Sequence, residues 1–205
     1  MSESIGKDEI MTGISSIVKI LVEVSGMVDS ELQRALEDDQ PAWHESRNET
    51  LKKIASLPKK YSFSKLFPAD EVGIAAQAAM ALLLRVEAEY HHIIIMIDMM
   101  KGERFRDIYM DALKSISTRV HEEITTLERI TSEYRENSEA LQSGLEKIRR
   151  LEREIDEENL IISRQISVAT EGESGYLCYL MRKIVSVLEH ISDDIEETAE
   201  ILAEL

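Results

Sequence analysis

Residues 177–203 have the sequence LCYLMRKIVSVLEHISDDIEETAEILA. Apolar side chains recur in it at helical spacing, namely Leu177, Met181, Ile184, Leu188, Ile191, Ile195 and Leu202. Because an α-helix turns once in about 3.6 residues, this spacing places them on one face. An acidic stripe, Glu189, Asp193 and Glu200, lies on another side of the same helix. The stretch therefore predicts an amphipathic helix with a core face and an outward-facing acidic stripe.

The same periodicity continues through nearly the whole chain and predicts six helices. Their expected ranges are 7–37, 41–57, 70–101, 103–137, 138–166 and 174–203. Residues 59–68 are expected to form a loop, and Asp70 is expected to cap the third helix. Helices in this order predict an all-α fold of two antiparallel three-helix bundle repeats packed side by side. The first repeat is expected to span residues 1–102 and the second residues 103–205.

The composition limits the classes of function. The net charge of the 205-residue chain is −16, and nucleic acids require clustered Lys and Arg, so nucleic-acid binding is not expected. The lone Cys178 indicates a reducing compartment and the N-terminus lacks a signal-peptide pattern, so a cytoplasmic location is expected. The most apolar stretch, 73–100, contains Arg85, Glu87 and Asp98, so at most a peripheral membrane contact is expected. A homo-oligomer is compatible with the sequence.

An internal repeat is visible when residues 86–87 are placed over 188–189. Glu87 then matches Glu189, His91 matches Asp193, and Asp98 matches Glu200. The same alignment places an earlier acidic pair, Glu45 and Glu49, roughly over a later one, Glu152 and Asp156. The alignment predicts that each half of the chain carries two short polar motifs, on its second and third helices.

The chemistry of these motifs favours a metal ion. Two carboxylates four residues apart on a helix repel each other, and Glu152/Asp156 and Glu189/Asp193 both have this spacing. A hard cation shared by oxygen ligands from two helices relieves the repulsion. Because the chain has 40 acidic residues, such pairs also arise by chance on solvated faces, and a metal-free structural adaptor stays open as an alternative.

A second alternative is a ferritin-like di-metal enzyme. Glu89 and His92 form a Glu-x-x-His motif, which di-iron bundles use twice, and Glu87 and His91 lie beside it. The sequence contains no second Glu-x-x-His motif, so such a site is incomplete. No sequence motif indicates nucleophilic catalysis, because Cys178 has no neighbouring histidine in sequence and no Gly-x-Ser-x-Gly motif occurs.

Residues 188–200, LEHISDDIEETAE, resemble the C-terminal signature of the PhoU-like family. Residues 151–156, LEREID, resemble that family's other acidic helix motif. The resemblance covers about residues 110–205. In the first half, Glu45-x3-Glu49 and Glu87-x3-His91 depart from the family's usual pattern of a carboxylate followed by Asp four residues later.

The resemblance implies a fold of two three-helix repeats with surface metal clusters of iron or zinc. It implies metal ligands at Glu152, Asp156, Glu189 and Asp193, and at the altered first-half positions Glu45, Glu49, Glu87 and His91. It also implies a regulatory role in phosphate uptake, with a phosphate transporter or sensor protein as partner and no enzymatic activity. The leading hypothesis is therefore a metal-binding regulatory adaptor that uses divalent or trivalent ions.

Overall fold

The regular structure is helical throughout the part of the chain that is described. The computed structural model describes residues 5–34, 40–101, 107–133, 138–169 and 175–205. The helices are α1 (Lys7–Gln33), α2 (Gln40–Ile54), α3 (Leu57–Tyr61), the 3-10 helix η1 (Ser62–Leu66), α4 (Glu71–Met100), α5 (Asp107–Glu133), α6 (Ser138–Ala169) and α7 (Tyr176–Glu204). The predicted all-α class is confirmed.

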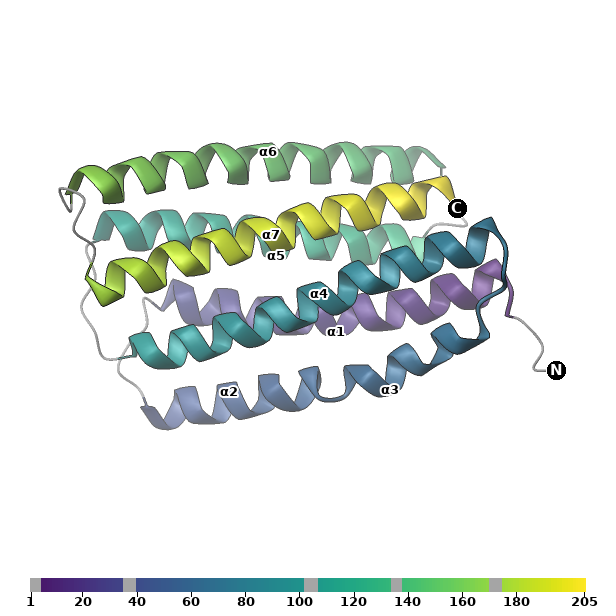
Figure 1. Ribbon diagram of the computed structural model, residues 1–205, viewed down its shortest axis with the longest axis horizontal. Coiled ribbons are helices and arrows are strands. Elements are labelled where there is room, and N and C mark those ends of the chain that lie inside the picture. Colours follow the sequence, from purple (N-terminus) through teal and green to yellow (C-terminus); the bar gives the residue numbers. More distant parts are fainter. Residues whose placement is uncertain (1–4, 35–39, 102–106, 134–137, 170–174) are drawn as a thin grey trace.

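The long helices lie side by side along one axis, in two groups. Figure 1 shows α5, α6 and α7 together above α1, α4 and the α2–α3 segment. The two groups are joined chiefly where α1 packs on α5 and α4 packs on α7. This is the predicted arrangement of two antiparallel three-helix bundles packed side by side.

The core forms from the apolar faces that the periodicity identified. On α1 the buried positions include Ile10, Ile14, Ile17, Leu21, Val24, Val28 and Leu32. On α7 they include Met181, Ile184, Leu188, Ile191, Ile195 and Leu202, whereas Leu177 is partly exposed. Burying a large aliphatic side chain contributes about 1.5–3 kcal/mol, so these stripes supply most of the force that aligns the helices.

Helix α1 is long and apolar enough to cross a membrane by length and composition alone. Half of its most apolar window is nevertheless buried inside the protein, against α4 and α5. A core helix of a bundle passes the same test, so this feature is weak evidence for a membrane span.

The segment between α2 and α4 differs from the expectation. The sequence predicts a loop over residues 59–68, but these residues fall largely within α3 and η1. Pro58 lies in the first turn of α3, where its missing N–H has no helical partner to lose. Leu57 and Tyr61, one turn apart, are both buried and hold this short helix against the bundle.

The N-terminus of α4 has the predicted capping residue. The Asp70 carboxylate accepts a hydrogen bond from the Gly73 N–H at 3.0 Å, so the expected N-cap is confirmed. The chain turns tightly here, because a Cβ atom on Gly73 would lie 1.8 Å from the carbonyl oxygen of Pro68. Only glycine fits this position without a shift of the backbone.

An ion pair joins the two groups of helices in the middle of the molecule. Arg85 on α4 makes a two-pronged hydrogen bond to Asp194 on α7, with Nε 2.7 Å from Oδ2 and Nη2 bonded to Oδ1. The Asp194 side chain is only 2% exposed, whereas Arg85 keeps more than half of its surface in solvent. A buried carboxylate needs such a partner, so this contact fixes how α4 lies on α7.

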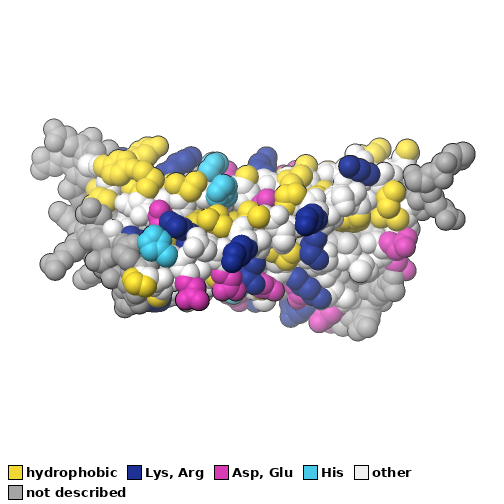
Figure 2. Space-filling model, turned by 90° about the horizontal axis from the view of Figure 1, so that it is seen from below, with side chains coloured by type: hydrophobic (Ala, Val, Ile, Leu, Met, Phe, Trp, Pro, Cys, Tyr) yellow, Lys and Arg dark blue, Asp and Glu magenta, His cyan; other side chains and the backbone are white. Residues whose placement is uncertain are grey.

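The face on which α2 and α3 lie has mixed charge. Figure 2 views the molecule from below relative to Figure 1, and Lys and Arg side chains lie there among Asp and Glu side chains. Positive and negative side chains are thus interspersed on this face.

Candidate metal centre between helices α6 and α7

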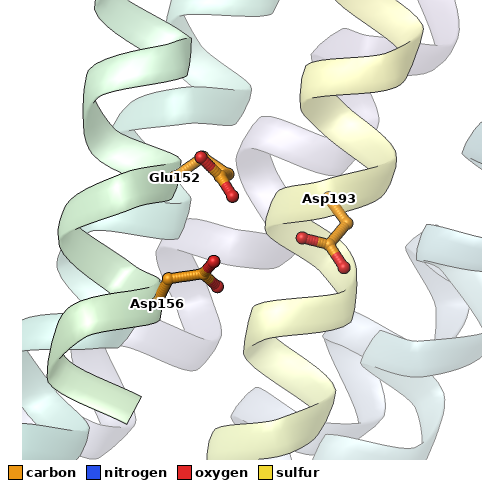
Figure 3. A group of neighbouring side chains, drawn as sticks. All are labelled: Glu152, Asp156 and Asp193. Carbon is orange, nitrogen blue, oxygen red and sulfur yellow. The ribbon is translucent and has the colours of Figure 1, made fainter. Parts of the chain in front are cut away.

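Three carboxylates from two helices meet in the second half of the chain. Glu152 and Asp156 lie one turn apart on α6, and Asp193 faces them from α7 (Figure 3). One oxygen from each of the three lies within 4.8 Å of the others. We call these three residues the carboxylate cluster. A single cation between them would contact carboxylates from both helices.

The helical periodicity places the cluster at the seam between α6 and α7. Each member directly follows a buried residue on its helix, namely Leu151, Ile155 and Ser192. The next position along a helix is rotated by about 100°, which moves the side chain from the core to its edge. The cluster therefore lies beside the core and remains accessible to solvent.

The electrostatics of the cluster are unfavourable without a cation. Partial burial raises the pKa of Glu152 to about 7, and the carboxylates of Glu196, Asp156 and Asp193 contribute. Partial burial, with the Asp156 charge, also raises the pKa of Asp193. Concentrated negative charge of this kind is typical of functional sites and of cation sites in particular.

The other members of the acidic stripe have different surroundings. Glu189 is half-buried, and burial together with the Asp193 charge raises its pKa. Its Oε2 atom lies 4.0 Å from His190 Nε2, and Glu189 is not part of the three-residue group. Glu200 accepts hydrogen bonds from Arg149 on α6, at 3.0 and 2.6 Å. Of the stripe, only Asp193 faces the two carboxylates of α6 at close range.

Glu123, which belongs to none of the sequence motifs described above, lies near the cluster. Glu123 on α5 is completely buried, and its Oε1 atom accepts a hydrogen bond from the Ser192 hydroxyl at 2.9 Å. Burial raises the pKa of Glu123 well above its usual range, and the carboxylates of Glu152, Glu196 and Asp193 raise it further. The sequence did carry a signal for it, because a glutamate interrupts the apolar stripe of α5 that Val120 and Leu127 continue.

The first-half motif residues are not brought together. On α2, Glu45 and Glu49 are exposed, and Glu49 Oε1 lies 3.7 Å from Lys53 Nζ. On α4, His91 is exposed and Glu87 is half-buried, with burial raising the Glu87 pKa. Among the described residues these four do not form a group with metal-ligand spacing.

The first-half counterpart of Glu200 has protein partners instead. Asp98 accepts hydrogen bonds from Trp43 Nε1 at 2.7 Å and from Arg47 Nη1 at 2.8 Å. The Trp43 hydrogen bond, followed by that from Arg47, lowers the pKa of Asp98. Trp43 and Arg47 of α2 thus satisfy the Asp98 carboxylate, and Arg47 balances its charge.

The residues of the ferritin-like alternative do not share an internal cavity. His91 and His92 are both exposed on α4, and His92 Nδ1 lies 3.5 Å from Glu89 Oε2 at the surface. The buried face of α4 is formed by Val86, Tyr90, Ile93 and Ile97. Because the helix turns the histidines away from that face, an internal di-metal site at these residues is contradicted.

Comparison with known proteins identifies a solved structure with the same fold. No family model and no curated protein matches the sequence. The crystal structure of the phosphate transport system regulatory protein PhoU from Streptococcus pneumoniae matches with a TM-score of 0.63, covering 96% of this chain and 92% of that one. The chain has the PhoU fold. At 13% sequence identity the likeness defines the fold alone, so any function must be argued from the residues.

The residues present in this PhoU fold fit a metal ion. The carboxylate cluster supplies three oxygen ligands, the donor type that hard cations prefer, and water can fill the remaining positions. Glu123 Oε2 is a buried oxygen without a hydrogen-bond partner. The concentrated negative charge of the three carboxylates matches the needs of a cation, and Glu123 lies outside their group.

The raised pKa values predict how stability depends on pH in the metal-free protein. Because Glu152 has a folded pKa of about 7, above its ordinary value, the folded chain binds more protons than the unfolded chain between about pH 4.3 and 7. Stability should therefore fall as pH rises through this window, with a Tm lower by roughly 5 °C at pH 8 than at pH 5. Thermal melts at a series of pH values, in the presence of a chelator, measure this change in Tm. In Glu152→Gln the Tm should depend less on pH. A wild-type Tm that rises with pH contradicts the expectation.

Proposed function

We propose that this chain is a PhoU-like regulatory adaptor of phosphate transport that binds a metal ion at Glu152, Asp156 and Asp193. The observation that carries the proposal is the meeting of these three carboxylates, from two helices, within 4.8 Å of one another. The PhoU fold supports it, since the matching crystal structure is that of a phosphate transport system regulatory protein. Glu189 lies one turn before Asp193 and is proposed as an outer ligand, whereas Glu45, Glu49, Glu87 and His91 have no such support.

The ligand type narrows the choice of metal. The cluster contains carboxylates only, which favour hard cations over those that prefer nitrogen or sulfur. Of the two metals that the family resemblance implies, ferric iron fits this donor set better than zinc. Mn²⁺ is a suitable probe because it prefers the same oxygen ligands and is soluble at neutral pH.

The proposed partner is a transporter or sensor protein of the phosphate transport system, met in the cytoplasm. The net charge of −16 favours a partner surface that carries Lys and Arg. In this role the chain is no enzyme. The metal would set the relative position of α6 and α7, and the partner would recognise the surface that these two helices form.

Metal analysis of the purified protein and a gene deletion test the proposal together. The protein should carry close to stoichiometric metal, which a chelator removes and Mn²⁺ restores. Deletion of its gene should change phosphate uptake, and a copy carrying Asp193→Asn should fail to restore it. A protein without metal affinity whose carboxylate variants still complement would favour the metal-free structural adaptor.

A further inference from the structure

Helix α4 is apolar on its exposed side as well as on its core side. Of the nine large hydrophobic residues that are exposed in the described part of the chain, four belong to α4, and they are 45–67% exposed. Exposed alanines fill the turns between them. At about 100° per residue, this set occupies roughly a third of the helix circumference. We call it the α4 face, and its members are Ile74, Ala78, Ala81, Leu84, Ala88, Ile95 and Met99.

Within the described chain the α4 face is left in solvent. Figure 1 shows α4 on the near side of the molecule, between α7 and the α2–α3 segment and in front of α1. After Glu71, only Arg85 and Asp98 among the exposed residues of α4 carry a permanent charge, and each is bound to a partner in the same chain. A contiguous exposed apolar surface of this kind is typical of an interface with another molecule.

Helix α7 extends this surface along its whole length. The Tyr176 hydroxyl lies 3.7 Å from Met99 Sδ, and Tyr176 is 56% exposed. Lys183, His190 and Glu197 follow Tyr176 at intervals of seven residues, so these exposed side chains continue along the side of α7 that adjoins α4. Two adjacent helices of this length present roughly 900 Å², and a stable dimer buries about 800 Å² per partner.

The α4 face is self-complementary about its middle. Leu84 and Ala88 lie two residues to either side of Val86, and Ala81 and the exposed His91 lie five residues to either side. Two α4 helices that pack antiparallel and are centred on Val86 therefore place Leu84 against Ala88, and His91 against Ala81, of the other copy. In each of these pairs a large side chain meets a small one, which lets two identical helices interdigitate.

The exposed charges of α7 fit the same symmetry. Lys183 and Glu197 lie seven residues to either side of His190. Arg85 on α4 is bonded to Asp194 on α7, which places the middle of the α4 face within about one turn of His190. In the antiparallel arrangement Lys183 of each copy therefore faces Glu197 of the other. Opposite charges meet twice, and this favours a second copy of the chain over an unrelated apolar surface.

We infer that two copies of this chain associate through the α4 face, with their α4 helices antiparallel about a two-fold axis at Val86. Ile74 of each copy then lies near Met99 of the other, so the apolar contact runs along the whole helix. Such a contact uses the same surface on both copies and closes with two subunits. The carboxylate cluster lies on the α6 side of α7 and stays accessible in the dimer, so the inference does not depend on the proposed function.

Sedimentation equilibrium of the intact protein tests the inference. The wild type should have about twice the chain mass of 23.4 kDa at micromolar concentration. Leu84→Glu and Ile95→Glu each place a charge against the other copy, so their dimer affinity should fall at least a hundredfold. Both positions are exposed in the single chain, so both variants should keep the helix content of the wild type by circular dichroism. Leu160→Glu on α6, at a position that is 57% exposed, is the matched control and should remain a dimer.

Disulfide cross-linking tests the orientation of the two helices. In a Cys178→Ser background, a protein that carries both Ala81→Cys and His91→Cys should form a covalent dimer on oxidation. The two positions lie about 15 Å apart along α4, which is too far for a disulfide within one chain. Each single variant should remain largely unlinked, because antiparallel packing separates identical positions by a similar distance.

The other outcomes overturn the inference. A monomeric wild type would do so, and a monomer that binds phosphatidylcholine vesicles would assign the α4 face to a membrane. Leu84→Glu and Ile95→Glu dimers as tight as the wild type would place the interface elsewhere. Efficient cross-linking by Ala81→Cys alone would mean that the helices are parallel. All of these results leave the metal site untouched.

Discussion

Replacing Glu152 with Gln and Asp193 with Asn in one protein should lower its affinity for Mn²⁺ at least a hundredfold. The two substitutions remove one proposed ligand from α6 and one from α7, so Asp156 is the only member of the carboxylate cluster that keeps its charge. A hundredfold loss corresponds to about 2.7 kcal/mol of binding free energy. The same protein without metal should be more stable than the wild type, because the repulsion that raises the Glu152 pKa is relieved.

A matched control carries Glu146→Gln and Glu204→Gln. These residues are exposed and lie outside the cluster, again one on α6 and one on α7. The control removes the same net charge, so a general electrostatic effect would weaken binding in both proteins alike. Equal affinities of the two double variants would exclude the cluster as the site.

Replacing Arg85 with Ala should destabilise the protein by about 2 kcal/mol and lower its Tm by roughly 4–8 °C. The substitution leaves the Asp194 carboxylate buried without its positive partner. The loss of one partner from a fully buried pair costs about 3–5 kcal/mol. Arg85 itself is largely exposed, so solvent screening already weakens the pair and the lower figure applies.

Arg150→Ala is the appropriate comparison for Arg85→Ala. Arg150 lies 3.8 Å from Glu154 on the same helix, and both side chains are well exposed, so its removal should change stability by less than about 0.5 kcal/mol. Arg85→Lys should fall between the two, since Lys keeps the charge but cannot form the two-pronged bond. Chemical denaturation measures all three. If Arg85→Ala unfolds like Arg150→Ala, the contact does not hold α4 to α7.

The core and the helix order could be predicted because they depend on local pattern. The spacing of Ile14, Leu21 and Val28 places them on one side of α1, and that side is buried. Asp70 could be predicted as a cap because its side chain acts three residues along the chain. Neither inference requires knowledge of which helices touch.

The residues that could not be predicted depend on contacts between distant helices. Pro58 was a fair sign of a break after α2, but the burial of Leu57 and Tyr61 against the bundle keeps the chain helical. Asp98 matched a candidate position, but spacing alone could not show that Arg47 lies 2.8 Å away on another helix. Glu123 interrupts an apolar stripe, yet its proximity to Glu152 arises only when α5, α6 and α7 assemble.

Asp193 and Asp194 are consecutive residues that serve different neighbours, the first facing α6 and the second bound to Arg85 on α4. Successive residues of a helix point about 100° apart, which allows adjacent aspartates to take these two tasks. Insertion or loss of a single residue before them would turn both side chains away from their partners at once. A change in the spacing of the proposed cation ligands on α7 would therefore also require a new contact between α7 and α4, where the two halves of the protein meet.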